Sequence, residues 1–234
     1  MGAVPRADSR TEPPHPDGGA PARDRRVALT VAAYDDEARE YQQFWRDKRL
    51  LDAARTFAAG AGRGSRVLDV AAGPALDVRL LRDAGLHVVA GDLSHESMRL
   101  AKVLFPKGAL ARWDFARLPL ADDTVDGVWA PGALQHVPRH RVRAVLGEWR
   151  RVQRRGPVFV TFREGAGDLE PVDDPPVGTV HVTTVSADEL QALLLDAGYV
   201  DVEVEPRPDL LGRREITWLH GTGRLTEGPT TTGA

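Results

Sequence analysis

Residues 67–75 read VLDVAAGPA, a short apolar run that ends beside an acidic residue and continues into a turn. Apolar runs of this length are typical of parallel strands buried on both faces of a sheet. The turn has the form of a cofactor-binding turn, but it keeps Gly73 and has Ala71 and Ala75 where two more glycines are expected. Glycines in such turns let the backbone bend tightly and approach a pyrophosphate closely. The stretch therefore predicts a strand, a turn and a helix, and a ligand that tolerates the two alanines.

Similar apolar runs alternate with helical patterns along the chain on the carboxyl side of this unit. We expect strands at 66–70, 87–92, 109–114, 125–130 and 157–162, and helices at about 76–84, 95–104 and 139–153. Ser94 is a candidate N-cap for the second of these helices, and Pro138 can open the third. Alternation of this kind predicts consecutive βα units with a mainly parallel sheet.

The pattern changes after Phe162. An acidic, Pro- and Gly-rich loop is expected at 164–184, and it leads into a capping box that begins at Ser186 and a helix that ends at Gly198. Two more strands follow near 200–205 and 214–221. The segment between them is too short for a parallel crossover, so we expect an antiparallel hairpin.

The size of the chain, 234 residues with 42% hydrophobic content, is enough for one large domain, which we place at 27–224. Helices at roughly 27–45 and 47–59 precede the first strand and are expected to form a helical lid over about 27–59. Residues 1–26 carry almost no large apolar side chain, so they and residues 225–234 are predicted to be disordered tails.

The composition narrows the classes of function. No apolar run approaches the length of about 20 residues that a membrane span needs. The net charge of −3 gives no bulk attraction to membranes or nucleic acid. The absence of cysteine excludes disulfide scaffolds, thiolate metal sites and cysteine nucleophiles, and it suits a cytoplasmic location. Arg25-Arg26 faintly resembles a twin-arginine export signal, but the apolar part that follows is too short, so we predict no signal peptide.

Two charged clusters suggest other partners. The arginines within 139–155 are interpreted as the solvated face of one helix and not as a nucleic-acid site, because no aromatic residues interleave with them. Asp122-Asp123 is interpreted as a solvated turn, because no histidine or third carboxylate stands at ligand spacing. We predict no metal and no nucleic-acid or membrane partner.

Over roughly residues 30–224, the order of the elements and the local motifs resemble the class I S-adenosylmethionine-dependent methyltransferases that act on small molecules. Asp69 matches the acidic residue of the family's first motif and Gly73 its central glycine. The resemblance implies a Rossmann-like α/β fold with a seven-stranded sheet in the order 3-2-1-4-5-7-6, mostly parallel with a C-terminal antiparallel hairpin, and with helices on both faces. S-adenosylmethionine has no phosphate, so alanine at 71 and 75 is tolerable, although it costs free energy wherever φ is positive.

The resemblance also implies roles for single residues in binding the cofactor. Asp69 receives the ammonium group, and Asp92, which lies 23 residues later, accepts the ribose hydroxyls. Asp114 takes the exocyclic amine of adenine, and the backbone amide of Phe115 takes a ring nitrogen. The remaining expected cofactor contacts are Ala71, Gly73, Leu93 and Ala130.

Three further residues are open to two interpretations. Tyr34 and Tyr41 share one helical face, so their phenols either close over the cofactor or pack on the sheet. His136 follows the fourth strand, where the family often has two histidines, and Gln135 replaces the first of them. His136 is a candidate general base, but we favour packing against the lid, because methyl transfer from a sulfonium can run on proximity and exclusion of water.

The sequence thus predicts a methyltransferase that acts on an O, N or C atom of a small molecule. The acceptor is expected beneath the N-terminal helices and the 164–184 loop. One alternative is a weak or inactive member of the same fold that serves as a partner subunit or scaffold. A nicotinamide-dependent oxidoreductase is a second alternative, which is disfavoured because Leu76 occupies the third glycine position of the dinucleotide fingerprint.

Overall fold

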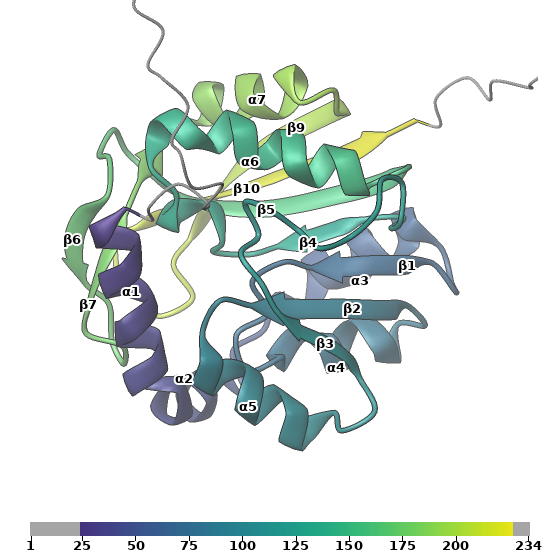
Figure 1. Cartoon of the computed structure of the whole chain (residues 1–234). Coiled ribbons are helices and arrows are strands. Elements are labelled where there is room, and N and C mark those ends of the chain that lie inside the picture. Colours follow the sequence, from purple (N-terminus) through teal and green to yellow (C-terminus); the bar gives the residue numbers. More distant parts are fainter. Residues whose placement is uncertain (1–23, 227–234) are drawn as a thin grey trace, which may run out of the picture.

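The computed structural model describes residues 24–226, so most of both predicted tails lies outside the described residues. A central sheet has the strand order β3-β2-β1-β4-β5-β10-β9, with β8 paired to β5 (Figure 1). Its strands are β1 Arg66–Asp69, β2 His87–Asp92, β3 Ala109–Arg112, β4 Val128–Ala130, β5 Gly156–Glu164, β8 Thr184–Val185, β9 Val200–Pro208 and β10 Thr217–Leu225. Strands β1 to β5 are parallel and β10 is antiparallel to both neighbours, so the predicted order and hairpin are confirmed.

Helices cover both faces of this sheet. Figure 1 shows α6 and α7 on one side and α4 and α5 on the other. The helices that flank the strands are α3 Leu51–Ala61, α4 Leu76–Asp83, α5 His95–Leu104, α6 Arg139–Val152 and α7 Ala187–Asp196. Apolar residues of α6 and α7 share one buried cluster with β4 and β5, whereas Phe57 of α3 packs on Trp129 and Phe159 on the opposite face. Within residues 24–226, no helix is long and apolar enough to cross a membrane.

The helix ends follow the predicted chemistry. Ser94 Oγ accepts a hydrogen bond from Ser97 N at 3.1 Å, and Ser186 Oγ accepts one from Glu189 N at 3.2 Å. Each hydroxyl satisfies one of the backbone donors that a helix leaves unpaired at its start. The backbone passes into the left-handed region at Gly198, with φ of +91°, directly after α7. The caps at these positions are therefore confirmed.

The predicted helix over 27–45 is wrong as a single element. The structure has α1 at Arg25–Asp36 and α2 at Ala38–Trp45, with Glu37 outside helical geometry between them (φ −107°, ψ +21°). Asp35 Oδ1 accepts hydrogen bonds from Ser94 Oγ and Glu96 N, which fixes the end of α1 on the start of α5. The chain changes direction at this anchor, and α2 continues beside α5 (Figure 1).

Four other predicted boundaries also shift. Residues 25 and 26 belong to α1 and Leu225 to β10, so these residues are not part of the tails. The strands predicted at 109–114 and 125–130 are shorter, because β3 ends at Arg112 and β4 begins at Val128.

The 164–184 segment, predicted as a loop, contains a two-stranded hairpin. Its strands are β6 Glu170–Asp173 and β7 Thr179–Val182, which pair antiparallel. Val180 and Val182 are buried against Ala33 and Tyr34 of α1, and His181 N donates to Thr30 Oγ1 at 2.9 Å. The hairpin forms because its alternating apolar residues have a partner at the far end of the sequence. We call α1, α2 and this hairpin the lid.

Candidate active site

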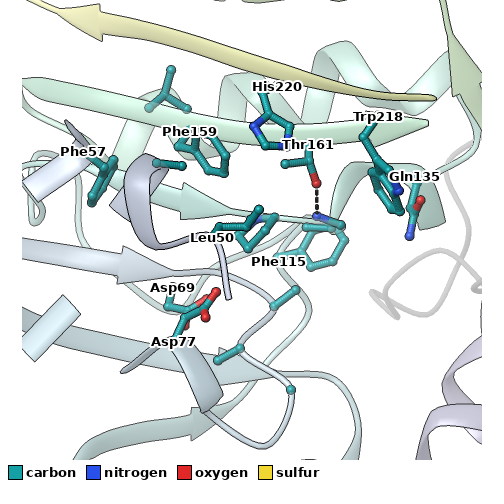
Figure 2. Close-up of a pocket in the computed structure, with 18 of the residues that line it drawn as sticks. Leu50, Phe57, Asp69, Asp77, Phe115, Gln135, Phe159, Thr161, Trp218 and His220 are labelled. Atoms are coloured by element: carbon teal, nitrogen blue, oxygen red, sulfur yellow. Dashed lines mark hydrogen bonds between the residues drawn. The ribbon is translucent and has the colours of Figure 1, made fainter. Parts of the chain in front are cut away.

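A cavity of about 1380 Å³ opens between the carboxyl ends of the parallel strands and the lid, and it extends over the face of β5 and β10 (Figure 2). Its lining contains all but one of the predicted site residues, namely Tyr34, Tyr41, Asp69, Ala71, Gly73, Asp92, Leu93, Asp114, Phe115 and His136. The exception is Ala130, which is fully buried within β4, while the following residues Pro131 and Gly132 line the cavity in its place.

Asp69 at the end of β1 is the most unusual group in the lining. Its side chain is only 2% exposed, and its Oδ2 atom has no hydrogen-bond partner among the described residues. Burial raises the pKa of Asp69 well above its ordinary value, and the nearby carboxylates of Asp77 and Asp92 raise it further. A buried carboxylate in this state costs free energy until a cation pairs with it. The position fits an ammonium group that arrives with a ligand.

Asp77, in the first turn of α4, was not predicted as a site residue. It lines the cavity beside Asp69, as Figure 2 shows, and accepts a hydrogen bond from Trp129 Nε1 at 2.9 Å. Burial raises the pKa of Asp77 although the Trp129 hydrogen bond lowers it. In the sequence, an acidic residue in the first turn of a helix is explained by the helix dipole alone, so nothing there marks Asp77 as a site residue.

Asp92 connects β2 to the turn that follows β1. Its Oδ2 accepts from Gly73 N at 2.8 Å and its Oδ1 accepts from Ser94 N at 2.8 Å. Burial raises the pKa of Asp92 in spite of these two hydrogen bonds. Each oxygen keeps a second lone pair, which leaves the carboxylate able to accept from two ligand hydroxyls. Asp92 therefore organises the turn and faces the cavity at the same time.

The two alanines of the turn differ in backbone conformation. Ala75 has φ of +60° and ψ of +38°, in the left-handed region, and is fully buried at the start of α4. Ala71 is not among the residues with positive φ, whereas Gly73 has φ of +52°. A left-handed alanine costs roughly 1–2 kcal/mol. The turn thus forms with a strained alanine, and that strain is confined to position 75.

We predict that Ala75→Gly changes the free energy of unfolding by less than about 1 kcal/mol. Relief of the left-handed strain offsets the loss of one buried methyl, about 0.8 kcal/mol, and the extra backbone entropy of glycine, about 0.5–1 kcal/mol. Ala101→Gly is the control, because Ala101 is equally buried but lies inside α5 with ordinary helical geometry. It should cost about 2 kcal/mol in the same urea titration. Equal losses for the two variants would contradict the strain at Ala75.

The segment after β3 forms another wall of the cavity. Trp113 is buried, and its Nε1 donates to Val70 O at 2.9 Å. Its indole lies where a Cβ atom on Gly91 would stand, so only glycine fits there. Phe115 packs edge-to-face on Trp149, whose Nε1 donates to Phe115 O at 3.0 Å. Asp114 accepts from Ala116 N at 3.0 Å, so the whole turn is held rigidly at the cavity.

The aromatic residues of the lid make a connected group. Tyr34 and Tyr41 pack edge-to-face with ring centroids 5.4 Å apart. Tyr34 Oη lies 3.2 Å from His136 Nε2, and His136 Nδ1 lies 3.0 Å from His181 O. A carbonyl oxygen can only accept, so Nδ1 carries the proton and Nε2 accepts from the tyrosine hydroxyl. This geometry favours packing against the lid over a role as general base, because the lone pair of His136 is already engaged.

Burial lowers the pKa of His136 to about 4, although the hydrogen bond to His181 raises it. The folded protein therefore favours the neutral imidazole. Above pH 6.5, the ordinary pKa of histidine in the unfolded chain, this preference costs no stability, and below it the free energy of unfolding falls until the pH reaches about 4. We predict that between pH 7 and 4.5 the wild type loses about 2–3 kcal/mol more unfolding free energy than His136→Asn. Urea titrations at the two pH values test this, and equal losses in both proteins would contradict it.

Beyond the carboxylates, the cavity is bounded by β5, β10 and the loop between β9 and β10. Gly132 N donates to Thr161 Oγ1 at 2.8 Å, and Figure 2 shows this bond near Phe115. The rings of Phe159 and His220 pack edge-to-face at 5.4 Å. Phe159 also stacks on Trp129, which donates to Asp77, so this wall reaches towards the carboxylates. We call the part of the cavity around Trp218, which Figure 2 draws on the right and away from Asp69 and Asp77, its aromatic end.

A charged network closes this aromatic end. Arg163 on β5 is 6% exposed and pairs with Asp174, which lies between the two strands of the lid hairpin, at 2.7 Å. Arg213 bridges Asp174 and Asp209 at 2.9 Å each. Asp209 also accepts from Trp218 Nε1 at 2.8 Å. The network joins the lid hairpin to the sheet and was not predicted, since its members are scattered along the sequence.

The sequence of the chain is similar to those of known methyltransferases. The family described as methyltransferase domain matches residues 68–161. A probable S-adenosylmethionine-dependent methyltransferase of Mycobacterium tuberculosis (strain CDC 1551 / Oshkosh) is 29% identical over 136 residues, which are 58% of this chain and 49% of that protein. A demethylmenaquinone methyltransferase of Renibacterium salmoninarum is 34% identical over 142 residues, 57% of each chain. The chain spans about half the length of the curated relatives it matches.

Solved structures extend the similarity in fold. The 1,6-didemethyltoxoflavin-N1-methyltransferase of Burkholderia thailandensis, with bound 1,6-didemethyltoxoflavin and S-adenosylhomocysteine, has a TM-score of 0.66 and 21% identity. The match covers 93% of this chain and all of that one. The chain has the Rossmann-like fold of the class I S-adenosylmethionine-dependent methyltransferases, and its central segment is similar in sequence to methyltransferases that depend on this cofactor.

Proposed function

We propose that the protein transfers a methyl group from S-adenosylmethionine to an O, N or C atom of a small molecule. The observation that carries this proposal is the buried carboxylate of Asp69, whose Oδ2 has no hydrogen-bond partner among the described residues, within a cavity that also holds Asp77 and Asp92. When bound, the cofactor supplies an electrophilic methyl group on a sulfonium. Its ammonium and sulfonium groups are cationic, which matches three carboxylates in one recess.

The proposed contacts divide the cavity along its length. Asp69 binds the ammonium group, and Asp92 accepts the ribose hydroxyls from its position between Gly73 and Ser94. The rigid turn that carries Asp114 and Phe115 holds the adenine. In addition to these predicted contacts, Arg49 lines the cavity close enough to interact electrostatically with Asp77, and it is suited to the carboxylate of the cofactor.

The chain's own residues contribute mainly by orientation and exclusion of water. Tyr34, Tyr41 and His136 close the cavity from the lid side. A closed, aligned site accelerates transfer because it removes the entropy of bringing two reactants together. The demethylmenaquinone and didemethyltoxoflavin enzymes among the similar proteins are named for small-molecule acceptors, which supports the same class here. A cytoplasmic location is part of the proposal, because a chain without cysteine suits a reducing compartment.

Isothermal titration with S-adenosylmethionine and S-adenosylhomocysteine tests the proposal. We expect both to bind, while NAD, titrated as a control for a nicotinamide-dependent enzyme, gives no heat. If neither methionine-derived ligand binds to the folded protein, the scaffold alternative is correct.

A further inference from the structure

Gln135 carries a buried polar atom that the cofactor contacts described above leave unused. The residue lies in the short 3-10 turn Leu134–His136 after β4, lines the cavity and is 3% exposed. Its backbone oxygen accepts from Thr183 N at 2.7 Å. Its side-chain Oε1 atom has no hydrogen-bond partner among the described residues. Folded proteins rarely leave such an acceptor unpaired, so a partner from outside the chain is expected.

The orientation of this amide is fixed by its neighbour. Gln135 Nε2 lies 3.3 Å from His136 Nε2, an acceptor that it shares with the Tyr34 hydroxyl, because the proton of the ring is on Nδ1 and is donated to His181 O. Only the nitrogen of the amide can face an acceptor favourably. The oxygen therefore points away from His136, and it remains available within the cavity wall.

Gln135 lies at the aromatic end of the cavity. Figure 2 draws it in the same part of the view as Trp218, on the right, and away from Asp69 and Asp77, where the cationic groups of the cofactor are proposed to bind. The rings of Phe159 and His220 lie on the wall between this end and Asp77, because Phe159 stacks on Trp129. A planar ligand can pack against such rings, and a neutral amide oxygen accepts a hydrogen bond from it without requiring charge.

We propose that Gln135 Oε1 accepts a hydrogen bond from an O–H or N–H group of the methyl acceptor, and that this acceptor is a neutral, planar aromatic molecule. The inference rests on the proposed function. The hydrogen belongs to the reacting atom or to a neighbouring substituent on the same ring. A ligand that lacks this hydrogen leaves the buried oxygen unpaired, and sites built around one hydrogen bond discriminate strongly against such analogues. Gln135 thereby determines specificity.

The first test measures stability without any ligand. Gln135→Leu removes an unpaired acceptor at nearly constant volume, so the melting temperature should rise by about 2–4 °C. The matched control is Gln153, which is fully buried and has all its groups paired. Its Nε2 donates to the carbonyls of Arg155, Gly156 and Pro157, and its Oε1 accepts from Tyr199 Oη at 2.9 Å. Gln153→Leu should lower the melting temperature by more than about 5 °C. A similar fall in the melting temperature of Gln135→Leu would show that Oε1 has a hydrogen-bond partner in the folded protein, and would overturn the inference.

The second test measures recognition of the hydrogen. With S-adenosylhomocysteine at saturation, we titrate 1-naphthol and its methyl ether 1-methoxynaphthalene, which differ at the hydrogen in question. The wild type should bind 1-naphthol about tenfold more tightly, and Gln135→Leu should bind the two compounds equally. Equal binding by the wild type, no binding of either compound, or a preference that survives in Gln135→Leu would each overturn the inference.

The cofactor titration separates this inference from the proposed function. Gln135→Leu should bind S-adenosylhomocysteine with the dissociation constant of the wild type, because the residue lies at the other end of the cavity. If the wild type does not bind S-adenosylhomocysteine, the proposed function fails. If it binds and the naphthol pair is not distinguished, only the assignment of Gln135 fails.

Discussion

Asp69→Asn should weaken the binding of S-adenosylhomocysteine by about 100-fold or more, and at neutral pH it should raise the stability of the ligand-free protein. The first effect follows because removal of one partner of a buried ion pair costs about 3–5 kcal/mol. The second follows because burial raises the pKa of Asp69 well above its ordinary value. When the pKa of an acid is higher in the folded protein than in the unfolded chain, its protonated form favours folding. This contribution to stability is lost as the pH rises through the pKa of the folded protein. Asparagine removes the cost of burying the charge and has nearly the same shape as aspartate.

Asp126→Asn is the matched control for this experiment. Asp126 is 3% exposed, like Asp69, but it accepts from Arg66 N at 3.0 Å and pairs with Arg154 at 2.6 Å. Burial raises the pKa of Asp126, but the hydrogen bonds outweigh this effect and the pKa is lowered overall. Asp126→Asn should therefore destabilise the protein at neutral pH and leave cofactor affinity unchanged. Isothermal titration and urea unfolding check both variants, and a destabilised Asp69→Asn would contradict the unpaired state of its carboxylate.

Asp174→Ala should lower the free energy of unfolding by about 3–5 kcal/mol. Asp174 pairs with the buried Arg163, and without it a guanidinium that is 6% exposed loses its counter-ion. Arg213 is affected less, because it keeps Asp209 as a partner. Urea unfolding with detection by tryptophan fluorescence measures the loss.

Asp52→Ala serves as the comparison for Asp174. The ion pair of Asp52 with Arg55 spans 3.4 Å, and both side chains are almost fully exposed (99% and 76%). Exposed pairs contribute about 0–1 kcal/mol, so this variant should remain close to the wild type. A loss below about 1 kcal/mol for Asp174→Ala would show that Arg163 finds another partner or water.

The sheet and the carboxylate end of the cavity could be predicted from the sequence because their signals are local. Strand β2 at His87–Asp92 and helix α5 at His95–Leu104 match the expected bounds, since a short apolar run and the Ser94 cap determine them without help from the rest of the chain. The strand-end carboxylates Asp69 and Asp92 meet at the cavity because parallel strands end at the same edge of a sheet.

The lid could not be predicted in the same way, because its structure depends on contacts between distant segments. The hairpin of β6 and β7 forms against α1 through pairs such as Thr30 with His181, which are 151 residues apart in the sequence. The break at Glu37 depends on Asp35 reaching the start of α5. The unpaired oxygen of Gln135 is a property of burial, which residue type and spacing do not reveal.

The cavity takes its walls from more of the chain than the segment that matches the methyltransferase domain family, 68–161. That segment carries the three carboxylates and also Gln135, whereas Tyr34, Asp174 and Trp218 lie outside it, on both sides. Substitutions in the flanking sequence can therefore reshape one side of the cavity while the carboxylates stay in place.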